Sequence, residues 1–414
     1  MSCNTKLRDV ADFQKGFAFK SKDYQDTGVK IVKVSNLTND SIDLSQCVCI
    51  DNELSKKYND KYELMSGDII ITTVGSWPTN PASVVGKVIK VPTDANNTLL
   101  NQNAVRVRSN SNINQRYLYY LLKNETFKEY IVGTAQGSAN QASITQEDIK
   151  NFEFELHPLE EQEKIANILS SLDDKIELNN EMNKTLEEMA QSIFKRWFVD
   201  FEFPNEDGEP YKSSGGEMVD SELGMIPKGW KYGTLDDIAN ITMGVSPKSS
   251  SYNTENIGMP LLNGASDFNG TIINPTKHTT EPKKICKKDD MVFCIRATIG
   301  NLTFADKEYC IGRGVASVTP KDEKYREFIY FNINNSIQSL ISQATGSVFL
   351  NLTKDNINNM KIVIPTKEVL NKFSEITSNI INKVQSNNVE NEGLINLRDS
   401  LLPKLMSGEL KVLK

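Results

Sequence analysis

The sequence predicts an α+β protein in which two tandem modules of mixed α/β structure are separated by a pair of long antiparallel helices, a coiled coil. Three observations predict this fold class. A ten-residue segment recurs in the second half of the chain, the apolar pattern changes from strand-like to helical after Pro158, and the helical pattern returns after Pro365. The 414 residues are enough for two or three domains, each with its own core.

The repeat defines the two modules. Leu7–Gly16 recurs as Leu235–Gly244, an offset of 235 minus 7, or 228. Further along, Asp68–Gly75 matches Asp290–Gly300. The matching segments would form the common fold of two related recognition modules, whose differing loops would give them different specificities. Ordinary sequence drift after duplication is the alternative explanation.

A long helix is predicted after the first module. Residues 159–200 contain no Gly or Pro, and their apolar positions alternate in steps of four and three, the spacing of a coiled-coil seam. Such a helix would have about 40 residues and a length of about 60 Å. Adding 208 to each seam position gives a second seam, in which Gly393 and Pro403 are expected to weaken the helix or set its end. The residues expected to pair the helices are Leu172, Ile176, Asn179, Asn183 and Leu186 in the first, and Ile380, Val384, Asn387, Asn391 and Leu394 in the second.

Both helices come from one chain, which favours an intramolecular antiparallel pair over a parallel homodimer. In that arrangement Asn179 and Asn183 would meet Asn391 and Asn387, and buried asparagines at seam positions specify register at a cost in stability. The predicted parts are a first module (1–157), a first helix (158–203), a linker rich in Gly, Ser and acidic residues (204–224), a second module (225–365), and a second helix with the C-terminal tail (366–414).

Composition excludes several classes of protein. No apolar stretch approaches the ~20 residues that cross a bilayer, and Met1–Thr5 has no apolar signal core, so we expect a cytoplasmic protein without membrane contact. Six cysteines are too few for a disulfide scaffold, and Cys47 and Cys49 are expected to be reduced packing residues rather than redox or metal ligands. Only His157 and His278 are present, which argues against a histidine metal site or a catalytic triad.

The charge is unevenly distributed. The net charge of −7 argues at first against nucleic acid, but residues 158–203 alone carry 5 basic and 11 acidic side chains, a net charge of −6. Because most of the acidic excess lies in this segment, the two modules can carry basic loops. The acidic helix face would repel DNA, so we expect it to face protein; a solvated helix face is the alternative.

Several segments resemble the specificity (S) subunit of type I restriction-modification enzymes, and the similarity runs over essentially the whole chain. It rests on Pro158–Gln162 with Leu172–Glu177, on Trp197–Phe201, on Ser221–Trp230 and on Leu397–Gly408. The second module departs from the pattern, because Glu368-Val369 stands where the first has Glu161-Gln162.

The resemblance implies a protein that supplies target choice and no chemistry. In that family two target-recognition domains each read one half of an interrupted, asymmetric double-stranded DNA sequence, and the helices dock two methyltransferase (M) subunits. Methylation and cleavage then need S-adenosylmethionine, ATP and Mg²⁺, which the M subunits and the motor-nuclease (R) subunits use. The sequence agrees, because it contains neither a G-x-x-x-x-G-K-[ST] phosphate loop nor an Asn-Pro-Pro-Tyr type tetrapeptide, and we expect no catalytic residue, cofactor or metal in this chain.

DNA contacts are expected on three pairs of loops at matching places in the two modules. Arginine reads guanine, Asn and Gln read adenine, and Lys, Ser and backbone N–H groups hold phosphates. The alternatives are that the loops are plain turns, that the arginines form surface salt bridges, and that Trp77 is a packing residue. The candidates are Lys15, Lys20, Ser76, Trp77, Asn80, Gln102, Asn103, Gly137, Ser138 and Asn140 in the first module, and Lys248, Arg296, Thr298, Asn301, Arg313, Gly346 and Ser347 in the second.

The helices would act as a ruler. A separation of roughly 45–60 Å corresponds to about 13 to 18 base pairs between half-site centres. Two other classes of function remain open at this point: a coiled-coil scaffold that does not bind nucleic acid, and an enzyme with an unrecognised active site.

Overall fold

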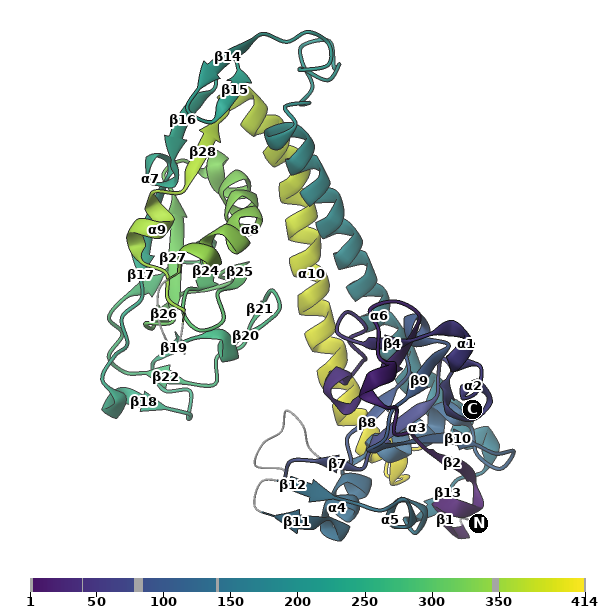
Figure 1. Cartoon of the computed structure of the whole chain (residues 1–414). Helices are drawn as coiled ribbons and strands as arrows, with labels where there is room; N and C mark the ends of the chain where they lie inside the picture. The colour runs from purple at the N-terminus through teal and green to yellow at the C-terminus, as the bar shows by residue number, and fades with distance from the viewer. Residues whose placement is uncertain (1–2, 39, 78–84, 139–140, 345–349, 413–414) are drawn as a thin grey trace. The chain divides into compact units, whose positions relative to one another are not determined.

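The computed structural model describes residues 3–38, 40–77, 85–138, 141–344 and 350–412 (Figure 1). The chain forms two compact units: residues 1–177 with 391–414, and residues 178–390. Each unit therefore contains one module together with parts of both long helices.

The first unit is built on a four-stranded antiparallel sheet of order β2-β10-β6-β8. A second sheet of order β4-β3-β9-β5 contains the parallel pair β3–β9, β11-β12-β7 form a small sheet, and β1 pairs with β13. The strands are β1 (Cys3–Lys6), β2 (Ala11–Lys15), β3 (Val29–Val32), β4 (Val48–Ile50), β5 (Glu63–Leu64), β6 (Ile69–Thr72), β7 (Val74–Gly75), β8 (Val88–Lys90), β9 (Thr98–Leu100), β10 (Ala104–Ser109), β11 (Gln136–Ser138), β12 (Gln141–Ser143) and β13 (Glu153–Leu156), and the module's helices are α1 (Asn52–Ser55), α2 (Asn59–Tyr62), α3 (Gln115–Lys123), α4 (Glu125–Thr134) and α5 (Gln146–Lys150).

The second unit repeats this topology. Its central sheet has the order β17-β27-β24-β25, and Ala316 pairs with Met243 as Val105 pairs with Lys15 in the first unit. The equivalent second sheet is β18-β22-β19-β26-β23, and β16 pairs with β28. The strands are β14 (Met218–Ser221), β15 (Gly224–Pro227), β16 (Lys231–Thr234), β17 (Ala239–Met243), β18 (Tyr252–Asn253), β19 (Met259–Leu262), β20 (Phe268–Asn269), β21 (Ile272–Ile273), β22 (His278–Thr279), β23 (Ile285–Cys286), β24 (Met291–Cys294), β25 (Gly300–Phe304), β26 (Tyr309–Ile311), β27 (Val315–Pro320) and β28 (Lys361–Ile364), with helices α7 (Leu235–Ile238), α8 (Arg326–Gln343) and α9 (Lys354–Asn358).

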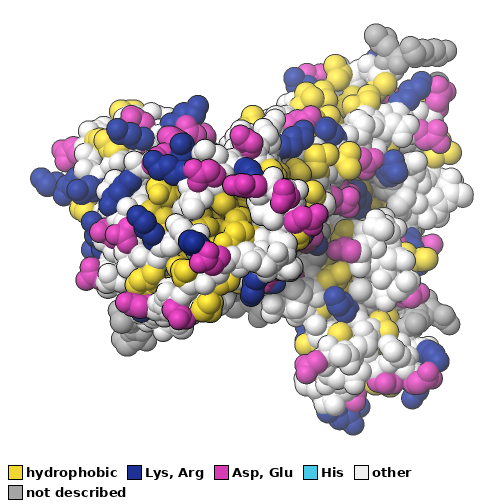
Figure 2. Space-filling model, turned by 90° about the horizontal axis from the view of Figure 1, so that it is seen from above, with side chains coloured by type: hydrophobic (Ala, Val, Ile, Leu, Met, Phe, Trp, Pro, Cys, Tyr) yellow, Lys and Arg dark blue, Asp and Glu magenta, His cyan; other side chains and the backbone are white. Residues whose placement is uncertain are grey.

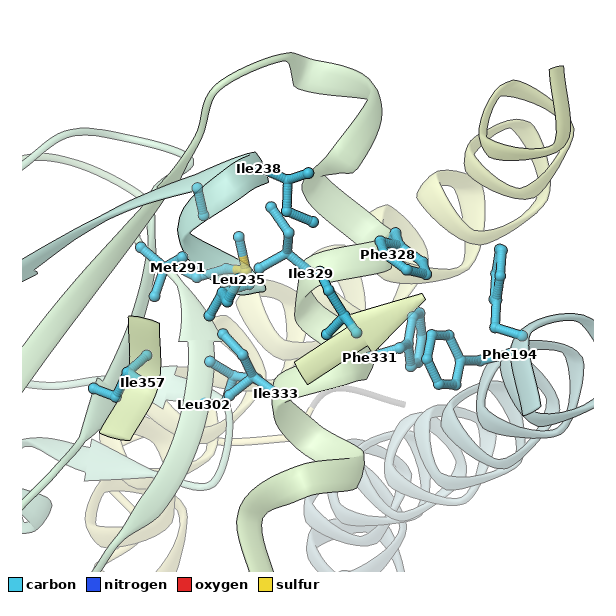
Figure 3. Close-up of a cluster of buried hydrophobic side chains, with 14 of the residues drawn as sticks. Phe194, Leu235, Ile238, Met291, Leu302, Phe328, Ile329, Phe331, Ile333 and Ile357 are labelled. Atoms are coloured by element: carbon cyan, nitrogen blue, oxygen red, sulfur yellow. The ribbon is translucent and has the colours of Figure 1, made fainter. Parts of the chain in front are cut away.

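Strands β6 and β24 carry apolar residues on both faces because both faces are covered by core residues. Ile69 and Ile71 of β6 join the core that includes α3 and α4, whereas Ile70 points to a second core on the other face. In β24, Met291 belongs to one core and Val292 to another. Alternate side chains of a strand point to opposite faces, so consecutive apolar residues are expected where a strand lies between two cores. Figure 3 shows the core of the second unit, with Met291, Leu302 and Ile329 pointing into it.

The two long helices are antiparallel. Helix α6 (Leu159–Phe194) continues as a π-helical turn over Lys195–Val199, and α10 spans Lys367–Met406. In the first unit Leu405, near the end of α10, shares a core with Ile165, near the start of α6. In the second unit Phe373 of α10 lies 5.9 Å, ring centre to ring centre, from Trp197.

The expectation that Gly393 or Pro403 ends the second helix is wrong, since α10 continues through both. Leu402 and Leu405 are buried in the core of the first unit, and this packing offsets the helix-breaking cost of Pro403. The chain turns instead at Gly408, which has φ +71° and donates its N–H to the Leu405 carbonyl at 3.3 Å.

Residues 204–224 are folded, although their composition predicts a linker. Phe203 stacks on Tyr211 at 4.6 Å and on Trp230 at 4.9 Å, and β14 forms a hairpin with β15. This polar segment folds because Tyr211 within it packs against Phe203, which in turn stacks on Trp230.

Cys47, Cys49, Cys286, Cys294 and Cys310 are free thiols, all buried except the partly buried Cys47. Burial raises the pKa of Cys286 and of Cys294 to about 12. Within the described ranges, no helix is long and apolar enough to cross a bilayer, and no three His, Cys, Asp or Glu side chains are grouped as metal ligands.

Candidate nucleic-acid interface

The predicted DNA-contacting loops meet at one end of the central sheet in each module. Strand β10 begins beside the end of β2 and beside the end of β6, because Val105 pairs with Lys15 and Ala104 pairs with Thr72. The corresponding pairs in the second module join the start of β27 to the ends of β17 and β24. The loops that follow β2, follow β6 and precede β10 therefore leave the sheet together (Figure 1).

In the first module the segment after β6 is tied to strands β11 and β12. Gly75 pairs with Ala142, and the Trp77 indole Nε1 donates to the Ser138 carbonyl at 2.8 Å. Trp77 is half-buried against the module core, which supports the packing interpretation of this residue. Ser76 is buried, whereas Gly137 and Ser138 are exposed.

The loop before β10 presents two amide side chains. Gln102 and Asn103 are exposed, and Asn103 has φ +72°. The Asn103 carbonyl accepts the N–H of Thr73 at 2.7 Å, just beyond the end of β6. This bond holds the amides beside the loop that carries Trp77.

The equivalent loop of the second module presents Arg313 between two glycines. A β-carbon on Gly314 would lie 2.2 Å from the Asn263 carbonyl oxygen, so this position requires glycine, whereas one on Gly312 would meet only the mobile Oδ1 of Asn263 at 2.5 Å. The backbone N–H and Nε of Arg313 each donate to Ser246 Oγ at 3.3 Å. Arg313 is thus an exposed guanidinium on a tightly packed loop.

The candidate residues after β24 lie in two different environments. Arg296 and Thr298 are exposed, and Arg296 forms an isolated bridge with Asn351 that parallels the Gly75–Ala142 pairing. Asn301 has φ +50° and lines a cavity next to α6 and α10 instead of extending with Arg296. Asn301 lies in β25 and not in the exposed loop, and it lines the cavity together with residues of α6 and α10.

The basic candidates occupy matching places. Lys20 and Lys248 each precede a short 3₁₀ turn, at the same position in the two repeats, and both are exposed, as is Lys15 at the end of β2. Among the residues that the structure describes, Arg296 and Arg313 form no ion pair, so the salt-bridge alternative finds no partner there.

Two other arginines are structural. Arg108 makes paired hydrogen bonds to Asp68 at 2.6 and 2.7 Å, and this contact raises the pKa of its guanidinium. Burial lowers the pKa of Arg106, which donates to the Glu63 carbonyl at 2.5 Å. Neither guanidinium is available to read a base.

Sequence reasoning missed Lys283 and Lys284. Both are exposed and directly precede β23, where Ile285 pairs with Cys310, so they run beside the strand that leads to Arg313. The adjacent lysines were a visible signal, but only the strand pairing brings them to this loop. Asn80, Asn140, Gly346 and Ser347 lie outside the described residues.

The helix pair contains the predicted asparagine contact. Asn387 Nδ2 donates to Asn183 Oδ1 at 2.8 Å, and Asn183 Nδ2 donates to Asn388 Oδ1 at 2.8 Å. Asn179 Nδ2 donates to Glu390 Oε2 at 2.9 Å, and the contact of Asn179 with Asn391 stays a prediction. Asn391 and Val384 are buried, and the remaining pairing candidates are partly buried, namely Leu172, Ile176, Leu186, Ile380 and Leu394.

Comparison with known proteins identifies a family. A family model described as the type I restriction modification DNA specificity domain matches residues 4–188 and 227–395, once for each repeat. The putative type I restriction enzyme MjaX specificity subunit of Methanocaldococcus jannaschii is 28% identical over 411 residues, covering 98% of this chain and 93% of the relative. The HindI specificity subunit of Haemophilus influenzae is 27% identical over 413 residues, covering 84% and 88%. The crystal structure of a type I restriction-modification S subunit from M. genitalium has the same fold, with a TM-score of 0.58 at 17% identity over 98% of this chain and 96% of that one.

Proposed function

Because this chain belongs to the type I restriction-modification DNA specificity family, we propose that each of its modules reads one half of an asymmetric, interrupted DNA target. The observation that carries the proposal is the convergence of unlike polar side chains on the same sheet end of two modules with one topology. The first module presents Gln102 and Asn103 where the second presents Arg313. Amides suit adenine and a guanidinium suits guanine, so the two half-sites would differ in sequence.

The long helices would set the spacing. Helix α6 has 36 residues, and a rise of about 1.5 Å per residue gives a rod of about 54 Å. That length supports the expected spacing of about 13 to 18 base pairs between half-site centres.

The same helices offer a docking surface for the two methyltransferase subunits. Leu178, Met189, Ile376 and Val389 are 53%, 51%, 41% and 70% exposed, although apolar side chains of this size are usually buried. In this proposal the motor-nuclease subunits join through the complex, S-adenosylmethionine, ATP and Mg²⁺ are used by the partner subunits, and this chain works in the cytoplasm as a non-catalytic subunit.

Mapping methylated adenines in host DNA with and without the gene tests the proposal. Loss of one interrupted, asymmetric motif is the expected result. An unchanged methylation pattern in a strain that expresses the M subunits would refute it. Salt-sensitive binding of the complex to a duplex that carries the motif would distinguish DNA recognition from a scaffold role.

A further inference from the structure

A cavity of about 750 Å³ lies inside the second unit, where α8 faces α6 and α10. Its volume is in the range of small-molecule sites, about 300–1,000 Å³. The apolar part of its wall includes Ala190, Phe304, Phe331, Ile381 and Val384. Figure 3 shows Phe331 from α8 and Phe194 from α6 pointing toward one another, and their ring centres lie 5.7 Å apart.

The first unit has a polar network at the equivalent place. There the Tyr120 hydroxyl of α3 donates to Asp173 Oδ2 at 2.6 Å, and Arg398 of α10 pairs with Asp173 at 2.7 Å. Tyr117–Leu122 aligns with Phe328–Ile333 at the offset of 211 that also relates Val105 to Ala316, so Phe331 corresponds to Tyr120. The helix offset of 208 makes Ile381 correspond to Asp173 and Ala190 to Arg398. All three line the cavity, so the second unit has lost the hydroxyl, the carboxylate and the guanidinium together.

The cavity nevertheless has an acidic edge. Glu187 and Glu188 of α6 line it, and within the part of the chain that the structure describes neither carboxylate has an ion-pair partner. Burial raises the pKa of the Glu187 carboxyl above its ordinary value. A carboxylate at the rim of an aromatic-lined cavity favours a cationic group, which would gain both the ion pair and contact with the ring faces.

We propose that this cavity binds a small organic cation with an apolar body, with its ammonium or amidinium group at Glu187 and its hydrocarbon part against Phe304, Phe331 and Val384. The bound cation would supply the charge that Arg398 supplies in the first unit, and it would link α8 to the helix pair as the Tyr120–Asp173–Arg398 network links α3. The inference concerns a ligand site and stands apart from DNA recognition.

Titration of the full-length chain with 4-phenylbutylamine, followed by calorimetry, tests the site. The neutral alcohol 4-phenylbutanol and the anion 4-phenylbutyrate have nearly the same body and serve as matched probes. We expect the amine to bind about 10-fold to 100-fold more tightly than the alcohol, because a charge-assisted bond is lost in the alcohol, and we expect no binding of the anion.

Two variants locate the site. Glu187→Gln should remove the preference for the amine while leaving alcohol binding unchanged. Glu181 is an exposed α6 carboxylate outside the cavity, so the control variant Glu181→Gln should leave the binding of both the amine and the alcohol unchanged. Ala190→Arg should abolish amine binding by placing the chain's own cation in the cavity. Circular dichroism checks that each variant is folded.

The proposal is overturned if wild type binds none of the probes, or if the amine and the alcohol bind equally, which would indicate a purely apolar cavity. It is also overturned if Glu187→Gln retains the preference for the amine. Should Ala190→Arg not fold, the Glu187→Gln comparison decides the matter alone.

Discussion

Breaking the Asp173–Arg398 pair from one side should destabilise the first unit more than replacing the whole network with the residues of the second repeat. The two side chains are only 14% and 13% exposed, and Arg398 Nη1 lies 2.7 Å from Asp173 Oδ1. Burial lowers the pKa of the Arg398 guanidinium, but hydrogen bonds and attraction to Asp173 and Asp399 raise it overall, so the arginine stays charged. Burial and Asp173 together raise the pKa of Tyr120, which therefore remains a hydrogen-bond donor.

The magnitude follows from what each change leaves behind. Arg398→Ala leaves the Asp173 carboxylate buried with the Tyr120 hydroxyl as its remaining partner. We expect a cost of about 3 kcal/mol, the lower end of the range for a broken buried pair, because some solvent reaches both groups. The triple change Tyr120→Phe, Asp173→Ile and Arg398→Ala reproduces the apolar set of the second unit. It leaves no unpaired buried charge, so it should cost less than Arg398→Ala alone, about 1–2 kcal/mol, which is the cost of the volume lost when the Arg398 side chain is removed.

Hydrogen exchange of the α3 amides in the full-length chain measures this difference. These amides report the local opening of the first unit, so the measurement does not require two-state unfolding of the whole chain. Lys164→Ala, which removes the exposed partner of Glu160 on α6, is the control and should change the opening free energy by less than about 1 kcal/mol. If the single and triple variants lose equal protection, the network is not a coupled buried pair and the reasoning fails.

Three further changes test other parts of the structure. Arg313→Ala should reduce the sequence preference at one base position of the target, at a cost of about 1–3 kcal/mol in binding free energy. Lys248→Ala should instead weaken binding to all sequences alike and reduce the salt dependence of binding. Competition binding against single-base variants of the target distinguishes the two effects. Asn183→Leu combined with Asn387→Leu should keep or raise the melting temperature while loosening helix register, although the partly buried Asn388 loses its bond from Asn183. Asn387→Leu alone leaves Asn183 Oδ1 without its donor and Asn183→Leu alone leaves Asn387 Nδ2 without its acceptor, at a cost of about 1–3 kcal/mol, as measured by thermal melting. Cys286, whose pKa burial raises to about 12, should stay protonated at pH 8 and resist iodoacetamide until the protein unfolds, as mass spectrometry can follow.

Each of these tests has a contradicting outcome. Uniform weakening by Arg313→Ala would show that this arginine holds phosphate rather than reading a base. A sharp drop in melting temperature of the double leucine variant would contradict the asparagine pairing as a register device. Rapid alkylation of Cys286 in the native protein would contradict its burial.

The sequence was sufficient for features that depend on local periodicity. The Leu7–Gly16 repeat predicted two modules of one topology, and the seam spacing predicted two long helices whose asparagines meet, as Asn183 and Asn387 do. Periodicity shows which face of a helix is apolar, and a repeat shows which positions are equivalent. Neither depends on knowing which distant segment lies opposite.

The tertiary structure decided everything that depends on long-range register. Strand pairing brings Lys283 toward Arg313, turns Asn301 toward the helices and partly buries Trp77, and none of these outcomes follows from residue type. Helix α10 also continues through Pro403, because burial of the neighbouring leucines stabilises the helix by more than the proline destabilises it. Equivalent positions line a smaller pocket with an ion pair in the first unit and a larger, more apolar cavity in the second, since the effect of a side chain depends on the residues that the other two elements place beside it.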